Sequence, residues 1–176
     1  MSAERRQALR GKYLKLGTGE LAAAASFAVV AIALVMPRLA GPDDSSALWS
    51  ALVPLLAVLV QAGIYWLAAR SWVERAPMPA PFAAAYRVFR IADAVLLGVG
   101  LVGILVWWPE GIGTALLVVA VWLFAVVEYL NYFAVRLAYP LDRWFIRVGR
   151  WRTPRLVQDL RTSAPASRAR NHSDPN

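Results

Sequence analysis

The run GTALLVVAVWLFAVVEYLNYFAV, residues 113–135, decides what kind of protein this is. It carries no charged residue before Glu128. About 20 consecutive apolar residues in a helix cross a hydrocarbon core about 30 Å thick, so this run is long enough to span a bilayer. A helix buried inside a soluble protein can have the same composition, and the neighbouring sequence separates these two interpretations.

Three further apolar runs of comparable length precede this one, at about residues 20–37, 47–69 and 90–108. Helical turns in FAAAYRVF extend the last of them upstream. Proline and glycine interrupt the helix between successive runs, and Trp107 and Trp108 at the last connection suit the headgroup region of a membrane. Four such runs in succession predict an all-α fold, a four-helix transmembrane bundle over residues 20–138.

The composition agrees with a small membrane protein. Of the 176 residues, 59% are hydrophobic and the mean hydropathy is +0.49, which is too apolar for an ordinary soluble domain of this size. The lack of cysteine excludes disulfides and thiol chemistry, and the single histidine, His172, lies in a polar tail. No phosphate-binding loop, nucleophile elbow or metalloprotease motif occurs. We therefore expect no cofactor, no metal and no catalytic set.

The distribution of charge predicts how the helices are threaded. Of the 19 lysines and arginines, all except Arg38 lie before the first run, around the connection between the second and third runs, or after the fourth. In a four-span protein these regions share one side of the membrane, and the side rich in Lys and Arg is normally cytoplasmic. Both termini are therefore predicted to be cytoplasmic. The first run lacks a convincing cleavage site and is expected to remain as an uncleaved span. The excess of arginine over lysine and the many alanines suggest a high-GC bacterium, which makes the location the inner membrane.

Polar residues gather in the predicted cytoplasmic half of the spans. Glu128, Asn131 and Tyr132 recur at helical spacing along one stripe of the fourth run. Because an acidic side chain facing lipid at the bilayer centre costs about 3 kcal/mol, this stripe is expected to face the bundle interior. The candidate cluster comprises residues of similar depth on three runs: Gln61, Tyr65, Arg90, Asp93, Glu128, Asn131, Tyr132 and Arg136. On the third run, Gly100 and Gly103 would let another helix approach closely.

This cluster has three interpretations. It is a structural latch if Arg90 pairs with Asp93 or Glu128 while Asn131 bonds to another helix. It is a ligand or proton site if Glu128 is the working group. It is an interface if another membrane protein covers it. The outer halves of the spans are mostly plain apolar residues, so a one-sided cluster favours a latch or a cytoplasm-facing site over a conduction path.

The segment after the spans, residues 139–162, shows helical spacing of apolar residues with arginines opposite. This pattern predicts an amphipathic helix in the membrane interface, with tryptophan at headgroup depth and arginine on phosphate. Packing under the bundle as a lid is a compatible alternative. The predicted lipid-headgroup contacts are Arg143, Trp144, Arg147, Arg150 and Trp151. Residues 1–19 form a basic cytoplasmic segment, and residues 163–176 are expected to be disordered.

The stretch EYLNYFAVRLAYP, residues 128–140, is followed by an arginine-rich segment and by RLVQDL at 155–160. This combination resembles the C-terminal portion of uncharacterised small four-helix bacterial membrane proteins, whose pattern runs E-[YFI]-[IL]-N-Y-[FY]-x-x-[QR]-L-x-Y, then a basic stretch, then L-x-x-DL. Arg136 stands where that pattern often has glutamine. The resemblance implies the same topology and marks Glu128 and Asn131, but it implies no activity.

Three functional hypotheses follow. The first is a non-enzymatic inner-membrane protein that acts through lipid and protein contacts. The second is a small oligomeric transporter or channel with Glu128 as a protonatable residue. The third is a lipid-headgroup enzyme with Asp93 and Glu128 at a cytoplasm-facing cleft. The expected partners are anionic membrane lipids and a membrane protein or further copies of the chain. Nucleic acid is not expected, because the basic residues flank apolar spans and no nucleic-acid-binding module is visible.

The threading can be tested with a reporter enzyme that is active only outside the cytoplasm. Fused to the C-terminus after Asn176, it is expected to be inactive, whereas the same reporter fused within the connection at residues 38–46 is expected to be active. Activity of the C-terminal fusion alone would overturn the predicted orientation.

Overall fold

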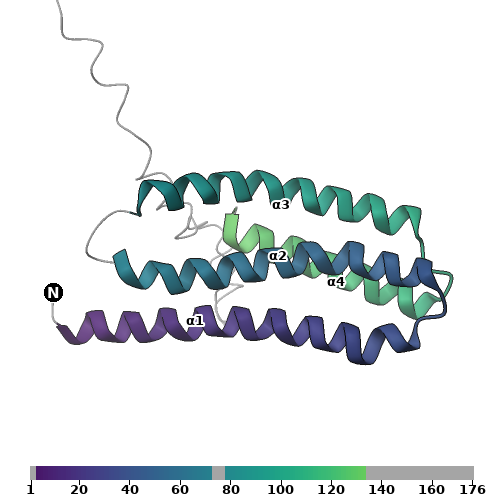
Figure 1. Ribbon diagram of the computed structural model, residues 1–176, viewed down its shortest axis with the longest axis horizontal. Helices are drawn as coiled ribbons and strands as arrows, with labels where there is room; N and C mark the ends of the chain where they lie inside the picture. Colours follow the sequence, from purple (N-terminus) through teal and green to yellow (C-terminus); the bar gives the residue numbers. More distant parts are fainter. Residues whose placement is uncertain (1–2, 73–77, 134–176) are drawn as a thin grey trace, which may run out of the picture.

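The computed structural model describes residues 3–72 and 78–133, and every regular element in these ranges is helical (Figure 1). The elements are, in chain order, α1 (Ala3–Val30), a π-helical turn (Ala31–Val35), a 3-10 turn (Met36–Arg38), α2 (Pro42–Trp72), α3 (Ala80–Val106) and α4 (Ile112–Phe133). Four of its helical segments are long and apolar enough to span a membrane, which confirms the predicted all-α, four-helix architecture. Arg136, the proposed amphipathic helix at 139–162 and the tail lie outside the described residues.

The helices are longer than the apolar runs that predicted them. Helix α1 begins at Ala3 rather than near residue 20, so most of the basic N-terminal segment is helical. Helix α2 has 31 residues, about 46 Å at 1.5 Å per residue, and so exceeds a hydrocarbon core of about 30 Å. The N-terminal part of α1 packs on α2 at Tyr13, which is buried with its ring 5.2 Å from the ring of Trp66. This packing stabilises the helix in the basic N-terminal segment, where the apolar periodicity of the sequence is too weak to predict one.

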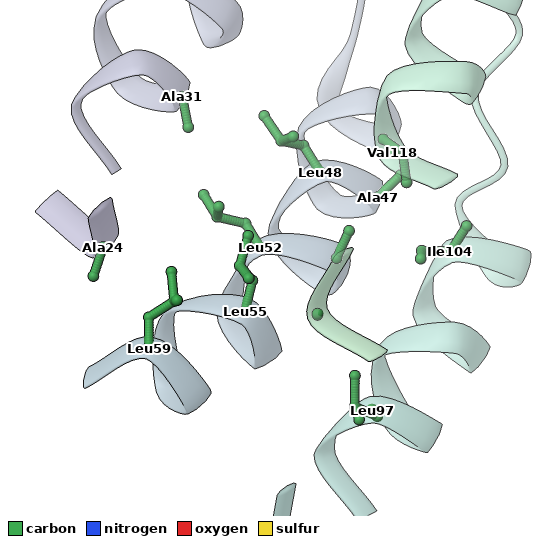
Figure 2. Close-up of a cluster of buried hydrophobic side chains, with 12 residues drawn as sticks. Ala24, Ala31, Ala47, Leu48, Leu52, Leu55, Leu59, Leu97, Ile104 and Val118 are labelled. Carbon is green, nitrogen blue, oxygen red and sulfur yellow. The ribbon is translucent and has the colours of Figure 1, made fainter. Parts of the chain in front are cut away.

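Helix α2 is the centre of the bundle. It packs against the other three helices, and α1 and α3 lie on opposite sides of it (Figure 1). In the most apolar 18-residue stretch of α2, 56% is buried inside the bundle. The corresponding shares are 28% in α3, 17% in α4 and 11% in the span that contains α1. Figure 2 shows the core around four leucines of α2: Leu48, Leu52, Leu55 and Leu59. The neighbouring elements contribute Ala24 from α1, Ala31 from the π-helical turn, Leu97 and Ile104 from α3, and Val118 from α4.

The contact between α2 and α3 depends on a proline facing two glycines. Pro54 is buried inside α2 and has no N–H, so the carbonyl of Ser50 loses its intrahelical donor. A Cβ on Gly100 would lie 2.4 Å from that carbonyl oxygen, and a Cβ on Gly103 would lie 2.4 Å from Ser50 Oγ. Only glycine fits at either position, as expected from the sequence. The close approach permits Cα–H···O contacts that partly replace the missing donor.

The contact between α1 and α2 is a reciprocal glycine crossing. A Cβ on Gly17 would lie 2.7 Å from Leu67 Cγ, and a Cβ on Gly63 would lie 2.7 Å from Leu21 Cγ. Each glycine also faces the backbone carbonyl of the other, 3.0 and 3.1 Å from the positions a Cβ would take. The leucine of each helix therefore lies over the glycine of its neighbour, which brings the two backbones close together.

Replacing Gly100 by alanine tests the α2–α3 contact, with Gly98 as a matched control on the same helix. A Cβ on Gly98 meets no atom within 4 Å. We expect Gly100→Ala to lower the free energy of unfolding by about 1–3 kcal/mol, because α3 must move away from Ser50. Gly98→Ala is expected to be neutral or to stabilise by up to about 1 kcal/mol through helix propensity. Denaturant unfolding in detergent micelles measures both, and a Gly100→Ala protein as stable as Gly98→Ala would contradict the contact.

Candidate functional site

A polar bridge joins α2 and α3. Gln61 Nε2 donates a hydrogen bond to Asp93 Oδ1 at 2.9 Å. Asp93 is only 2% exposed, although it lies midway along a helix long and apolar enough to span a membrane. Gln61 Oε1 and Asp93 Oδ2 are also buried, and neither has a hydrogen-bond partner within residues 3–72 and 78–133. Two of the predicted cluster residues are thus brought into direct contact.

A layer of tyrosines supports this bridge. The hydroxyl of Tyr86, on the same face of α3 as Asp93, donates to the backbone carbonyl of Gln61 at 2.7 Å. Tyr65, 1% exposed, meets Tyr86 edge to face with ring centroids 5.7 Å apart. Tyr65 and Asp93, two members of the predicted cluster, are both buried, and Tyr86 adds a second hydrogen bond between the same two helices.

A second polar group joins α4 to α1. The hydroxyl of Tyr132, which is buried, donates to the carboxylate of Glu20 on α1. Glu128 lies one turn before Tyr132 and is hydrogen-bonded to the side chain of Asn131. Glu20 is near enough to Glu128 for the two carboxyl groups to repel each other. Two acidic residues therefore share this part of the bundle, and both are half-buried.

A small cavity of about 10 Å³ lies where the two polar groups meet. Its lining comes from α2, α3 and α4: Val58, Gln61, Ala62, Tyr65, Tyr86, Tyr132 and Phe133. A volume of this size corresponds to about one water molecule. The cluster is packed tightly enough to exclude an organic substrate at this point.

Arg90 does not take the place expected for it. Its side chain is exposed, and its backbone carbonyl accepts a hydrogen bond from the Tyr129 hydroxyl at 3.1 Å. Asp93 is bonded to Gln61 instead. A long arginine side chain can extend from a helix to the membrane surface while its stem stays in apolar surroundings, which removes the need for an internal acid. Arg136 lies outside the described residues.

Two interhelical contacts were not found from the sequence. Glu20 is the first residue of the first apolar run, and its place at the end of that run was the only available signal of a contact with Tyr132. Trp122 Nε1 donates to the backbone carbonyl of Leu97 at 3.0 Å. A buried indole usually finds an acceptor, but the sequence does not indicate which one.

The opposite end of the α2–α3 contact holds a larger, open groove of about 540 Å³. Its walls are mostly apolar and include Val53, Val99 and Val102, with Trp49 and Trp107 on the same lining. The sequence alone describes this half of the bundle as plain apolar helix. The groove forms because Gly100 and Gly103 present no side chain beside Pro54.

No protein-family model matches the sequence, and neither a curated protein nor a solved structure matches it. What the chain does is therefore inferred from its own residues and their arrangement.

Replacing Tyr132 by phenylalanine tests the α1–α4 bridge, with Tyr129→Phe as the control. Tyr132 bonds to a side chain of another helix, whereas Tyr129 bonds to a backbone carbonyl beside an exposed residue. We expect Tyr132→Phe to cost about 1–2 kcal/mol of unfolding free energy and Tyr129→Phe about 0.6 kcal/mol or less. Unfolding in detergent micelles provides the comparison. Equal losses of unfolding free energy in the two variants would contradict a stabilising hydrogen bond between Tyr132 and Glu20.

Proposed function

We propose that this chain is a non-enzymatic protein of the bacterial inner membrane that acts through contacts with lipids and with other membrane helices. The polar side chains that first suggest chemistry are engaged with one another. Gln61 is bonded to Asp93, and Tyr132 is bonded to Glu20. Hydrogen bonds of this kind between membrane helices contribute about 0.6–2 kcal/mol each, which suits a cluster that holds the bundle together.

The size of the cavity at the cluster is the observation that carries the proposal. Sites for small organic ligands have volumes of about 300–1,000 Å³, whereas the cavity lined by Gln61, Tyr65, Tyr86 and Tyr132 measures about 10 Å³. Asp93 is 2% exposed, so its carboxyl group is enclosed by the bundle and does not face an open cleft. These two facts argue against the lipid-headgroup enzyme with Asp93 and Glu128 as its acids.

The apolar faces of the outer helices support contact with lipid and protein. On α3 one face is open along its whole length, through residues each at least 59% exposed: Val88, Ile91, Val95, Val99, Val102, Leu105 and Val106. These side chains meet lipid tails or the helices of a partner protein or of a second copy.

Basic residues at the N-terminal end of α1 support an attraction to anionic headgroups. Lys12 and Lys15 are exposed and line a surface hollow of about 450 Å³ together with Gly11. With both termini cytoplasmic, as proposed from the charge distribution, these lysines face the anionic leaflet surface, where each cationic residue contributes about 1 kcal/mol of attraction. The arginines and tryptophans at 143–151 extend the same proposal to the segment after α4.

One observation favours the second candidate, a small oligomeric transporter or channel. Glu128 on α4 lies close to Glu20 on α1 and is hydrogen-bonded to Asn131, so two acidic side chains approach each other at one end of the bundle. Both acids are half-buried rather than sealed. A second copy of the chain would be needed to build a path, because the described interior is tightly packed.

Photocrosslinking in native membranes, followed by purification of the products into lipid discs, tests the proposal. A photoreactive residue in place of Val95, on the open face of α3, is expected to crosslink to a stoichiometric protein partner or to a second copy. The same residue in place of Leu52, which is buried in the core, is expected to give no intermolecular product. Crosslinks from neither position would contradict a role through protein contacts.

Flux measurements separate the second candidate from the first. Liposomes that contain the full chain and carry a pH gradient are expected to lose the gradient no faster than empty liposomes, with or without Glu128→Gln. Glu110→Gln is the matched control, because Glu110 is exposed near the opposite end of α4. Flux that Glu128→Gln abolishes and Glu110→Gln leaves intact would replace the scaffold proposal by the transporter.

A further inference from the structure

The bridge between Gln61 and Asp93 has too few donors for its acceptors. Gln61 Nε2 donates to Asp93 Oδ1, which leaves Gln61 Oε1 and Asp93 Oδ2 buried without a partner in the part of the chain the structure describes. An amide oxygen and both oxygens of an ionised carboxylate can only accept hydrogen bonds. The two orphan atoms are therefore the remaining oxygens of one hydrogen-bonded pair.

A single proton satisfies both atoms. A protonated carboxyl group has one O–H donor and keeps an accepting oxygen, so it can accept from the amide N–H and donate to the amide oxygen at the same time. The count does not depend on how the amide of Gln61 is oriented. If its nitrogen and oxygen are exchanged, the two atoms 2.9 Å apart are both oxygens and again need a proton between them.

The groups around Asp93 do not supply that donor. The Tyr86 hydroxyl is bonded to the backbone carbonyl of Gln61, the Tyr132 hydroxyl is bonded to Glu20, and the side chain of Arg90 is exposed. Other titratable or charged residues on the surrounding helices include Tyr65 on α2, Arg87 on α3, Glu128 and Tyr129 on α4 and Glu20 on α1. The hydrogen bond recorded for the Asp93 carboxyl group is the one from Gln61.

The surroundings make an unbalanced pair expensive. Asp93 is 2% exposed and lies midway along a membrane-length helix, so few groups other than its packed neighbours can satisfy it. A buried polar atom without a partner costs about 1–3 kcal/mol, and more when it is charged. Gln61 and Asp93 also lie on the two helices held together at Gly100 and Pro54, so any separation of these helices would act against that close contact.

We propose that Asp93 and Gln61 form a proton-binding site in which Asp93 Oδ2 carries a proton and donates it to Gln61 Oε1. The proton is exchanged with water, and no other group is oxidised, reduced or transferred. The bridge is then an uncharged carboxylic acid–carboxamide pair with two hydrogen bonds. This assigns the bound proton of the bundle to Asp93 rather than to Glu128, and the assignment stands whether the chain is a scaffold or a transporter.

Infrared spectroscopy of the full chain in lipid discs at neutral pH tests the assignment. The wild-type protein is expected to show a carbonyl band of a protonated carboxyl group. Asp93→Asn should remove the band, Gln61→Leu should shift it because the hydrogen bonds are lost, and Glu128→Gln should leave it in place. A wild-type spectrum without the band, or a band that only Glu128→Gln removes, would overturn the proposal.

Thermal unfolding of two Asp93 variants gives an independent readout. Asparagine supplies an N–H group where the protonated Oδ2 stood, so Asp93→Asn is expected to keep both hydrogen bonds and the wild-type Tm. Asp93→Leu breaks both bonds, leaves Gln61 unpaired and should lower Tm. Equal losses of Tm in both variants would contradict the paired acid. A rise of the wild-type Tm in sodium relative to choline, absent in Asp93→Asn, would assign the site to a metal cation and would also overturn the proposal.

Discussion

The close approach of α2 to its neighbours is the constraint on which the rest of the bundle depends. Lipid tails are as apolar as leucine, so burying leucine between membrane helices gains little, and helices associate through tight packing and hydrogen bonds. Helix α2 meets α1 where Gly17 and Gly63 face each other, and it meets α3 where Pro54 lies against Gly100. Because α2 contacts all three other helices, its apolar residues continue around the whole helix instead of forming one stripe.

The polar cluster is part of the same contacts. Asp93 is two helical turns from Gly100, where the backbones of α2 and α3 approach closely, and its carboxyl group meets Gln61 on α2. The close approach at Gly100 therefore positions the Asp93 carboxyl group as well as helix α3. A bulkier residue at Gly100 would disturb the hydrogen bond as well as the packing.

Hydropathy and charge predicted the four helices because crossing a bilayer requires a minimum apolar length, which any sequence must satisfy. Helical spacing and the cost of a polar group in lipid also predicted that the stripe carrying Tyr132 faces inward, and Tyr132 is buried. Neither signal says which helix lies opposite. The partners of these residues, Gln61 for Asp93 and Glu20 for Tyr132, depend on the three-dimensional packing. For the same reason the helical N-terminal extension was missed, because its support comes from Tyr13 packing on another helix.

Space is distributed unevenly along the described part of the bundle. The cavity beside Gln61 measures about 10 Å³, whereas the groove beside Gly100 and Gly103 holds about 540 Å³ and is open to the surroundings. Val99 and Val102 line that groove and also belong to the exposed face of α3, so the two surfaces are continuous. With a neutral Gln61–Asp93 pair, the polar end of the bundle would serve cohesion between helices, and the apolar face of α3 would serve external contacts. The neutral pair would hold α2 and α3 together without placing a charge in the membrane field, which acts with about 2.3 kcal/mol per elementary charge per 100 mV. The apolar face of α3 would then be free to meet lipid or another helix without changing the charge inside the bundle.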